Sequence, residues 1–302
     1  MPKSASSGQL PEPGEIFLDH VGWMVPDMGQ AATTFERLGF KLTPYSVHGD
    51  RDPATGELKP VGSANRLAML ERGYLEILTP IDGYDTPVAR HMRNAIAHHT
   101  GVHLLAFSVH DAAEFGHEIT ARDFTLQPTV HLRRTVENEA GGQSEVAFTV
   151  VRAAFDQFPE ARMQVVTHHT PEHMWQSRYL SRESGITGLL EAAIVTTNPG
   201  EAALRYSRFL GRRAEPDGAS IVVRLDRGAL RFVDPRGAAE RFGRISKPPM
   251  PAVGAVTLTS RDLDKTRYFL LSQGLRPGAI DPTHLLIDAS EALGVHLVIV
   301  SE

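Results

Sequence analysis

Apolar strand patterns recur at four places along the chain, and a short amphipathic helix follows each of them. The strands are predicted over residues 17–25, 101–109, 189–196 and 252–259. The helices are predicted to end near Gly39, Ala121, Gly211 and Gly274, and further strands follow them. This repeated order predicts an α+β fold of four βαβββ modules, paired so that each half of the chain forms a cupped mixed sheet.

Two of the closing strands also resemble each other in sequence. Residues 72–80, Arg-Gly-Tyr-Leu-Glu-Ile-Leu-Thr-Pro, match residues 227–235, Arg-Gly-Ala-Leu-Arg-Phe-Val-Asp-Pro, and the match aligns Glu76 with Arg231. We therefore predict two tandem domains, residues 16–184 and 185–302, the second a degenerate copy of the first. Residues 1–15 are rich in Pro, Ser and Gly and are predicted to be a disordered tail rather than a signal peptide.

Candidate metal ligands lie in the strands of the first half. His20 lies in the middle of the first strand, and His103 is placed at the equivalent point of the second module, on a face with Leu105 and Phe107. Glu76 lies among apolar residues, where an ionised carboxylate is costly unless it is paired or bound to a cation. A lone His or Glu in a strand is more often a surface residue or a hydrogen-bonded core residue, but recurrence in matching positions favours ligation.

Two further residues are candidates for a fourth ligand. Gln164 aligns with Glu76 in the closing strand of the second module, and His168 lies four residues later on the same face. Either residue could reach the metal.

The second half of the chain offers different residues at these places. Glu191 stands where the first module has His20, Arg231 stands in place of Glu76, and no histidine lies near Ala255. A Glu and an Arg across a cupped sheet predict an ion pair, so this half is expected to be structural or to form a wall of the substrate pocket.

With these residues identified, the sequence resembles a glyoxalase-like domain of the vicinal oxygen chelate superfamily over roughly residues 17–190. The resemblance rests on His20, on Glu76, on residues 62–66 (Gly-Ser-Ala-Asn-Arg) and on residues 167–175 (Thr-His-His-Thr-Pro-Glu-His-Met-Trp). It implies the vicinal oxygen chelate fold, with metal ligands His20, Glu76 and His103 and with Gln164 or His168 as the fourth. Many members have Glu where this chain has Gln164, which favours a three-ligand, dioxygenase-like set over a four-ligand one.

The resemblance implies an enzyme that chelates two oxygens of a small substrate on a divalent metal and stabilises an enediolate-like or catecholate-like anion. The reaction is left open between a lyase or isomerase and a ring-cleaving dioxygenase, and the metal between iron, manganese, zinc and nickel. Glu76 or His168 is the candidate base, and Asn65 and Arg66 could orient the substrate. The alternative is a non-catalytic protein that sequesters a small molecule, whose pocket in this superfamily commonly forms between the subunits of a homodimer.

Composition narrows the remaining choices. The absence of cysteine excludes disulfides, thiolate nucleophiles and cysteine-based zinc sites, and a formal net charge of -5 without a basic run argues against a nucleic-acid partner. No apolar stretch reaches the roughly 20 residues needed to cross a membrane. We therefore expect a cytoplasmic protein with a small-molecule substrate.

Overall fold

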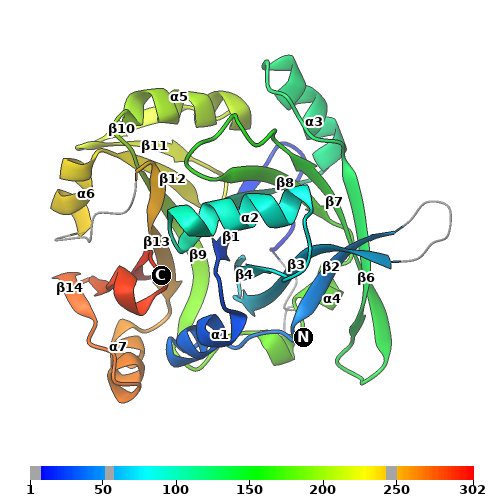
Figure 1. Cartoon of the computed structure of the whole chain (residues 1–302). Coiled ribbons are helices and arrows are strands. Elements are labelled where there is room, and N and C mark those ends of the chain that lie inside the picture. The colour runs from blue at the N-terminus through cyan, green and yellow to red at the C-terminus, as the bar shows by residue number, and fades with distance from the viewer. Residues whose placement is uncertain (1–7, 52–57, 243–249) are drawn as a thin grey trace.

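The computed structural model describes residues 8–51, 58–242 and 250–302, and within them the strands form two eight-stranded sheets (Figure 1). The first sheet has the order β2 (Ser46–Arg51), β3 (Leu58–Met69), β4 (Tyr74–Pro80), β1 (Ile16–Met24), β5 (Gly101–Val109), β8 (Arg162–His168), β7 (Gln143–Arg152) and β6 (Val130–Glu137). The second has the order β10 (Ala214–Asp217), β11 (Ser220–Arg224), β12 (Ala229–Val233), β9 (Ile186–Val195), β13 (Ala252–Ser260), β16 (His296–Ser301), β15 (His284–Ile287) and β14 (Gly278–Asp281).

The two sheets repeat one topology. In the first, β1 is parallel to β4, β5 is parallel to β8, and the two pairs join through an antiparallel contact between β1 and β5. In the second, β9, β12, β13 and β16 are joined in the same way. Four modules paired into two mixed sheets confirm the predicted vicinal oxygen chelate architecture.

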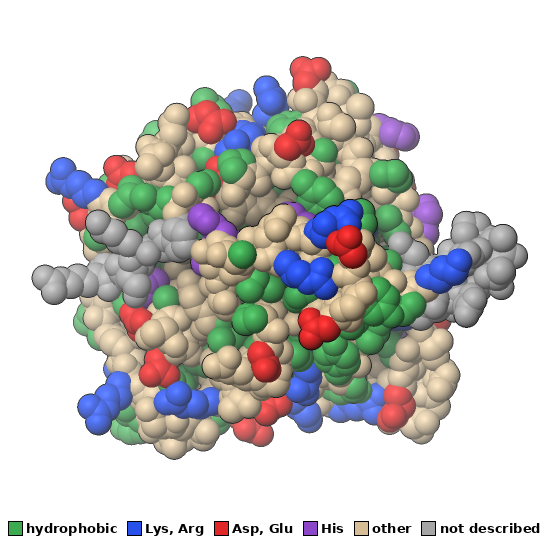
Figure 2. Space-filling view, viewed as in Figure 1, with side chains coloured by type: hydrophobic (Ala, Val, Ile, Leu, Met, Phe, Trp, Pro, Cys, Tyr) green, Lys and Arg blue, Asp and Glu red, His purple; other side chains and the backbone are tan. Residues whose placement is uncertain are grey.

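The helices are α1 (Met28–Arg37), α2 (Pro87–His98), α3 (Ala112–Ala121), α4 (Pro171–Met174), α5 (Pro199–Leu210), α6 (Pro235–Phe242) and α7 (Leu263–Ser272), with short 3-10 turns at Ser177–Tyr179 and Ala289–Glu291. The helix after the first strand of each module begins at a side chain that accepts a hydrogen bond from a backbone N–H of the first turn: Asp27, Asp111, Asn198 and Asp262. None of the helices in the described ranges is long and apolar enough to cross a membrane. Acidic and basic side chains intermingle over the face shown in Figure 2.

The main hydrophobic core covers one face of both sheets. On β1 it takes Val21 and Trp23, on β5 Leu105 and Phe107, and on β9 Ile194, all fully buried. Because side chains alternate along a strand, the residues between these positions face the opposite side of the sheet. That opposite face of the first sheet holds the pocket.

Each of the four central strands carries a β-bulge at an equivalent place. On β1, Leu18 pairs with Phe107 of β5, and His20 pairs with the neighbouring residue, Ala106. Asp19, between them, is therefore an extra residue without a partner on β5. By the same count the extra residues are His103 on β5, Leu190 on β9 and Gly254 on β13. A bulge re-aims the side chains beside it and breaks the two-residue alternation.

The two halves are joined by direct contacts. Trp23 Nε1 donates to the carbonyl of Ala292 at 3.2 Å, and bridges pair Phe17 with Arg227 and Arg72 with Gly188. The chain passes from the first sheet to the second between β8 and β9. Because the main core runs across both sheets, a division into separately folding domains at residue 185 stays a prediction.

The predicted N-terminal tail, residues 1–15, needs a correction for its described part. Gln9 is fully buried, its amide donates to the carbonyl of Glu71, and its oxygen accepts from Gly73 N at 3.2 Å. Gln9 is therefore anchored to the turn between β3 and β4, while Arg227 and Arg212 of the second half donate to the carbonyls of Gly8 and Gly14. Residues 1–7 lie outside the described ranges.

Candidate functional site

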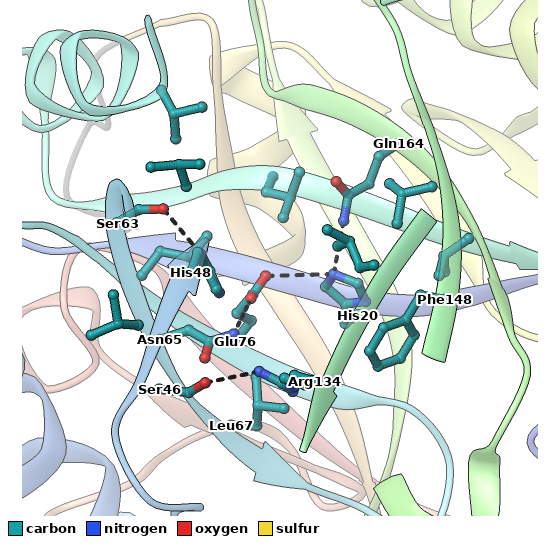
Figure 3. A pocket seen from close by; sticks show the side chains of 18 of the residues that line it. His20, Ser46, His48, Ser63, Asn65, Leu67, Glu76, Arg134, Phe148 and Gln164 are labelled. Carbon is teal, nitrogen blue, oxygen red and sulfur yellow. Dashed lines mark hydrogen bonds and ion pairs between the residues drawn. The ribbon is translucent and has the colours of Figure 1, made fainter. Parts of the chain in front are cut away.

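A pocket of about 480 Å³ lies on the face of the first sheet opposite the core. Its floor consists of side chains from the central strands, and helix α2 closes one side with Val88 and Met92. Figure 3 shows His20, Glu76 and Gln164 pointing toward one another in this pocket, from β1, β4 and β8. All three are buried, with exposures of 3%, 8% and 9%.

His20 is held in a fixed orientation. Its Nδ1 donates to Asp19 Oδ2 at 2.7 Å, and its ring stacks on Tyr74 with 4.3 Å between centroids. Since Nδ1 carries the proton of this hydrogen bond, Nε2 of the neutral ring presents a lone pair to the pocket. This is the arrangement in which histidines bind metals, with a carboxylate behind the ligand.

Asp19 connects this histidine to a second one. Its other oxygen, Oδ1, accepts from His168 Nε2 at 3.0 Å, and the carboxylate is fully buried. Burial alone would raise the pKa of Asp19, but the charge of His168 and the hydrogen bonds from both histidines outweigh burial and hold that pKa well below its usual range. Asp19 is therefore a fixed negative charge behind His20.

Glu76 is fixed on one side and open on the other. Asn65 Nδ2 donates to Glu76 Oε1 at 2.7 Å, while Glu76 Oε2 lies 3.5 Å from His20 Nε2. That separation is long for a hydrogen bond. Two lone-pair atoms therefore face each other in a buried site, where a cation or a shared proton between them is stabilising.

Gln164 completes the group of converging side chains. Its amide nitrogen lies 3.2 Å from His20 Nε2. Rotating the terminal amide by half a turn puts the oxygen, a metal donor, in that position. The register supports the predicted alignment of Gln164 with Glu76, because Gln164 pairs with Ala106 on β5 as Glu76 pairs with Gly22 on β1.

The donor set fits a small divalent cation. Two ligands about 2.1 Å from one ion, at tetrahedral or octahedral angles, lie roughly 3.0 to 3.4 Å apart. The distances from His20 Nε2, 3.5 Å to Glu76 Oε2 and 3.2 Å to the Gln164 amide, are close to this range. Within the described ranges no group of three or more His, Cys, Asp and Glu side chains is placed to hold a metal, so a third protein donor would be an amide oxygen, such as that of Gln164.

The structure does not bring His103 to this group. His103 is the extra residue of the β5 bulge, its Nε2 donates to the carbonyl of His99 at 2.8 Å, and burial lowers its pKa. Leu104 lines the pocket instead. Leu104 follows its bulge as His20 follows Asp19, so the structural equivalent of His20 is an apolar residue.

Two other candidates lie away from the pocket. His168 does not contribute to the lining: it binds Asp19 and packs against the ring of Trp175, with 4.9 Å between centroids. Arg66 alternates with Asn65 along β3 and faces the other side, where its Nε donates to the carbonyl of Thr43 at 2.8 Å. Asn65 does line the pocket.

Several site residues were not among the sequence candidates. They are Asp19 and Tyr74 beside His20, His48 on β2, whose Nδ1 lies 3.0 Å from Ser63 Oγ, and a set of pocket arginines. A signal for the bulge was present in the sequence. Matching the core pair Leu105 and Phe107 to Val21 and Trp23 would have aligned Leu104, and not His103, with His20.

The equivalent positions of the second sheet hold an ion pair, as predicted. Arg231 Nε and Nη2 each donate to one oxygen of Glu191 at 2.8 Å, and Arg231 Nη1 donates to Asp217 Oδ2 at 2.7 Å. The remaining equivalents of Leu104 and Gln164 are Ala255 and Val298. The guanidinium satisfies the acid, so this group has no open donor to offer a ligand.

The sequence of the chain matches one known protein family. Residues 18–210 match the family described as "Glyoxalase-like domain". No curated protein matches the sequence. Similar solved structures include a hypothetical protein from Staphylococcus aureus (TM-score 0.64, 10% identity, 95% of this chain and 100% of that chain).

Two other similar structures carry more informative names. One is a mutant of 4-hydroxymandelate synthase from Streptomyces coelicolor (TM-score 0.57, 14% identity, 96% of this chain and 93% of that chain). The other is a xylose isomerase-like TIM barrel/4-hydroxyphenylpyruvate dioxygenase fusion protein (TM-score 0.59, 11% identity, 97% of this chain and 50% of that chain). At these identities they establish the fold alone. Together, the family match and the two-sheet architecture show that the chain belongs to the glyoxalase-like domain family of the vicinal oxygen chelate superfamily.

Proposed function

We propose that this chain is a divalent-metal-dependent enzyme that acts on a small oxygenated organic molecule in the pocket of the first sheet. One observation carries the proposal. His20 Nε2 and Glu76 Oε2, each with a lone pair, face each other at 3.5 Å in a buried site, and the amide of Gln164 lies 3.2 Å from the same nitrogen. A bound cation stabilises such an arrangement of donors.

His20, Glu76 and Gln164 are the residues that would hold the ion. Asp19 fixes the protonated nitrogen of His20, and Asn65 fixes one oxygen of Glu76, as outer partners of metal ligands commonly do. Histidine, carboxylate and amide donors suit iron, manganese, zinc and nickel. When bound, the ion would supply Lewis acidity that polarises substrate oxygens.

Glu76 is also the residue best placed to move a proton. One of its oxygens is held by Asn65, and the other faces the pocket beside His20. A carboxylate in this position can accept a proton from a substrate carbon or hydroxyl group next to it. His168, which contacts Asp19 and does not line the pocket, acts in this proposal as a positioning residue for His20.

The reaction type stays open between lyase or isomerase chemistry and dioxygenase chemistry. The names of two similar structures, a 4-hydroxymandelate synthase and a 4-hydroxyphenylpyruvate dioxygenase fusion, favour oxygen chemistry. The three-donor set also favours it over a four-ligand glyoxalase I site.

A second candidate function is non-catalytic sequestration of a small molecule. The observation in its favour is Leu104, an apolar side chain at the position equivalent to His20. A metal site with a missing ligand could be vestigial, and a pocket of about 480 Å³ is large enough for a drug-sized molecule.

Elemental analysis of protein purified without a metal-affinity tag separates the two candidates. We expect stoichiometric divalent metal in the wild type, or after reconstitution with iron, manganese, zinc or nickel. The isosteric variant Glu76→Gln should lose most of it while unfolding at a similar temperature. A wild type that binds none of these ions would exclude the enzyme proposal and leave sequestration.

A further inference from the structure

The charge of the pocket is unbalanced. Its lining includes the arginines Arg133, Arg134, Arg152 and Arg162, whereas Glu76 is the one carboxylate among the described lining residues. Arg133 is exposed and pairs with Glu145 at 2.6 Å, so its charge is compensated at the rim. Arg152 has an interaction of its own, and the two remaining arginines, Arg134 and Arg162, line the pocket close enough to Glu76 for its charge to act on both.

Arg162 lines the pocket from β8 and is half-buried, with its Cζ 5.0 Å from the centre of the Phe155 ring. It precedes Gln164 by two residues on β8, so the two side chains leave the same face of the strand about 6.6 Å apart. Its Nε is buried without a hydrogen-bond acceptor, and within the described ranges no carboxylate forms an ion pair with it. Burial and the charge of Arg152 lower its pKa to about 9.

Arg134 provides a second positive charge on the other side of the donor group. Its Nη1 donates to Ser46 Oγ at 3.2 Å, its Nε is buried without an acceptor, and its Cζ lies 5.9 Å from the centre of the Phe148 ring. In Figure 3 it approaches His20 and Glu76 from the side opposite Gln164. A buried guanidinium without an anion is costly, so both arginines favour a ligand that carries negative charge.

The space beside Arg162 is apolar. Met24, Leu78, Met92 and Leu104 form one buried cluster there, and all four line the pocket together with Val88 of α2. The register places this cluster and Arg162 at the same end, because Arg162 pairs with Leu104. An apolar body can therefore pack on this cluster while an acidic group reaches the guanidinium.

From this arrangement we propose that the substrate is an organic acid, whose carboxylate is held by Arg162 and whose apolar body packs against Leu78, Met92 and Leu104. That the bound acid is a substrate rests on the proposed function. The binding of the anion itself depends only on the arginines and the apolar wall. A divalent ion at His20 and Glu76 would add positive charge and strengthen the preference.

The test is a fluorescence titration of chelator-treated, metal-free protein with 2-naphthoate and with 2-naphthamide. The two probes have the same ring system and differ in charge. We expect the wild type to bind naphthoate at least about 10-fold more tightly than naphthamide, as for a charge-assisted hydrogen bond. Arg162→Gln should remove this preference, Arg162→Lys should keep part of it, and Arg134→Gln should reduce it less.

Arg90→Gln is the matched control, because Arg90 lies on α2 but is exposed and pairs with Asp85 at 2.8 Å. It should bind naphthoate as the wild type does. Equal binding of the two probes, no binding of either, or an Arg162→Gln protein that is folded by circular dichroism and binds naphthoate normally would overturn the proposal. Because the titrated protein is metal-free, this outcome is independent of elemental analysis: either proposal can fail while the other stands.

Discussion

The two sheets use one scaffold for opposite electrostatic purposes. Beside equivalent bulges, the first sheet presents His20 and Glu76, whose Nε2 and Oε2 face each other at 3.5 Å. The second sheet presents Glu191 and Arg231, a carboxylate and a guanidinium that form an ion pair. The backbone registers of the two pairs are equivalent. The difference lies entirely in the side chains.

An ion pair closes the site of the second sheet to a metal. A carboxylate and a guanidinium in a bidentate ion pair have no free atom to coordinate a metal, and they stabilise the sheet only while both are present. The first sheet keeps its donors available, because Asp19 and Asn65 hold His20 and Glu76 without blocking the atoms that face the pocket. Removing a side chain should therefore cost mostly stability in the second sheet and mostly binding in the first.

The largest expected effect is on stability in the second sheet. Replacing Arg231 with Met leaves Glu191 buried without its partner, and the free energy of unfolding should fall by about 3 to 5 kcal/mol in urea titrations. Removing an exposed arginine with Arg236→Met, which breaks a surface pair with Glu240, should change stability far less, because solvent screens that pair. Metal content should stay at the wild-type level in both variants. Loss of metal in Arg231→Met would show that the metal site lies in the second sheet and not in the first.

A smaller loss of stability is expected behind the first site. Asp19→Asn removes the charge that both His20 and His168 contact, and should lower the free energy of unfolding by about 1 to 3 kcal/mol at neutral pH. It should also weaken metal binding by roughly 10-fold to 100-fold, because His20 loses the partner that fixes its ring.

The same variant gives a pH test with a defined sign. The folded-state pKa of Asp19 is depressed below the ordinary value of 3.8, so its contribution to stability is present above that pH and is lost as the pH falls below it. The wild type should therefore lose stability faster than Asp19→Asn between about pH 4 and pH 2. If the free energy of unfolding fell equally with pH in the two proteins, Asp19 would not be a buried, charged acceptor.

The smallest expected effect is a gain in metal affinity. Leu104→His supplies a histidine at the position that the register makes equivalent to His20, so metal affinity should rise on the order of 10-fold in a chelator competition assay. The same change at the equivalent position of the second sheet, Ala255→His, should leave affinity unchanged, because Glu191 and Arg231 neighbour it there. Equal gains in both variants would argue against the assigned equivalence.

Much of this architecture could be predicted from periodicity. Side-chain alternation and helix-capping residues predict the four strand-and-helix repeats and the core positions Val21 and Trp23. The alignment of the repeats predicts the ion pair of Glu191 and Arg231. Strict alternation along β5 predicts His103 beside His20, but His103 is the extra residue of a bulge, and one extra residue moves a side chain to another environment. The pocket arginines lie on β6, β7 and β8, and no local sequence pattern encodes how these strands bring them to the same pocket as Glu76.

The central claim is that the first sheet, and not the second, binds a divalent ion through His20 and Glu76. The most direct test is a manganese titration followed by electron paramagnetic resonance, comparing the wild type with His20→Ala and with Glu191→Ala. We expect saturable manganese binding in the wild type and in Glu191→Ala, and loss of most binding in His20→Ala while its circular dichroism spectrum is unchanged. Binding that survives in His20→Ala, or that disappears in Glu191→Ala while that protein remains folded, would contradict the central claim.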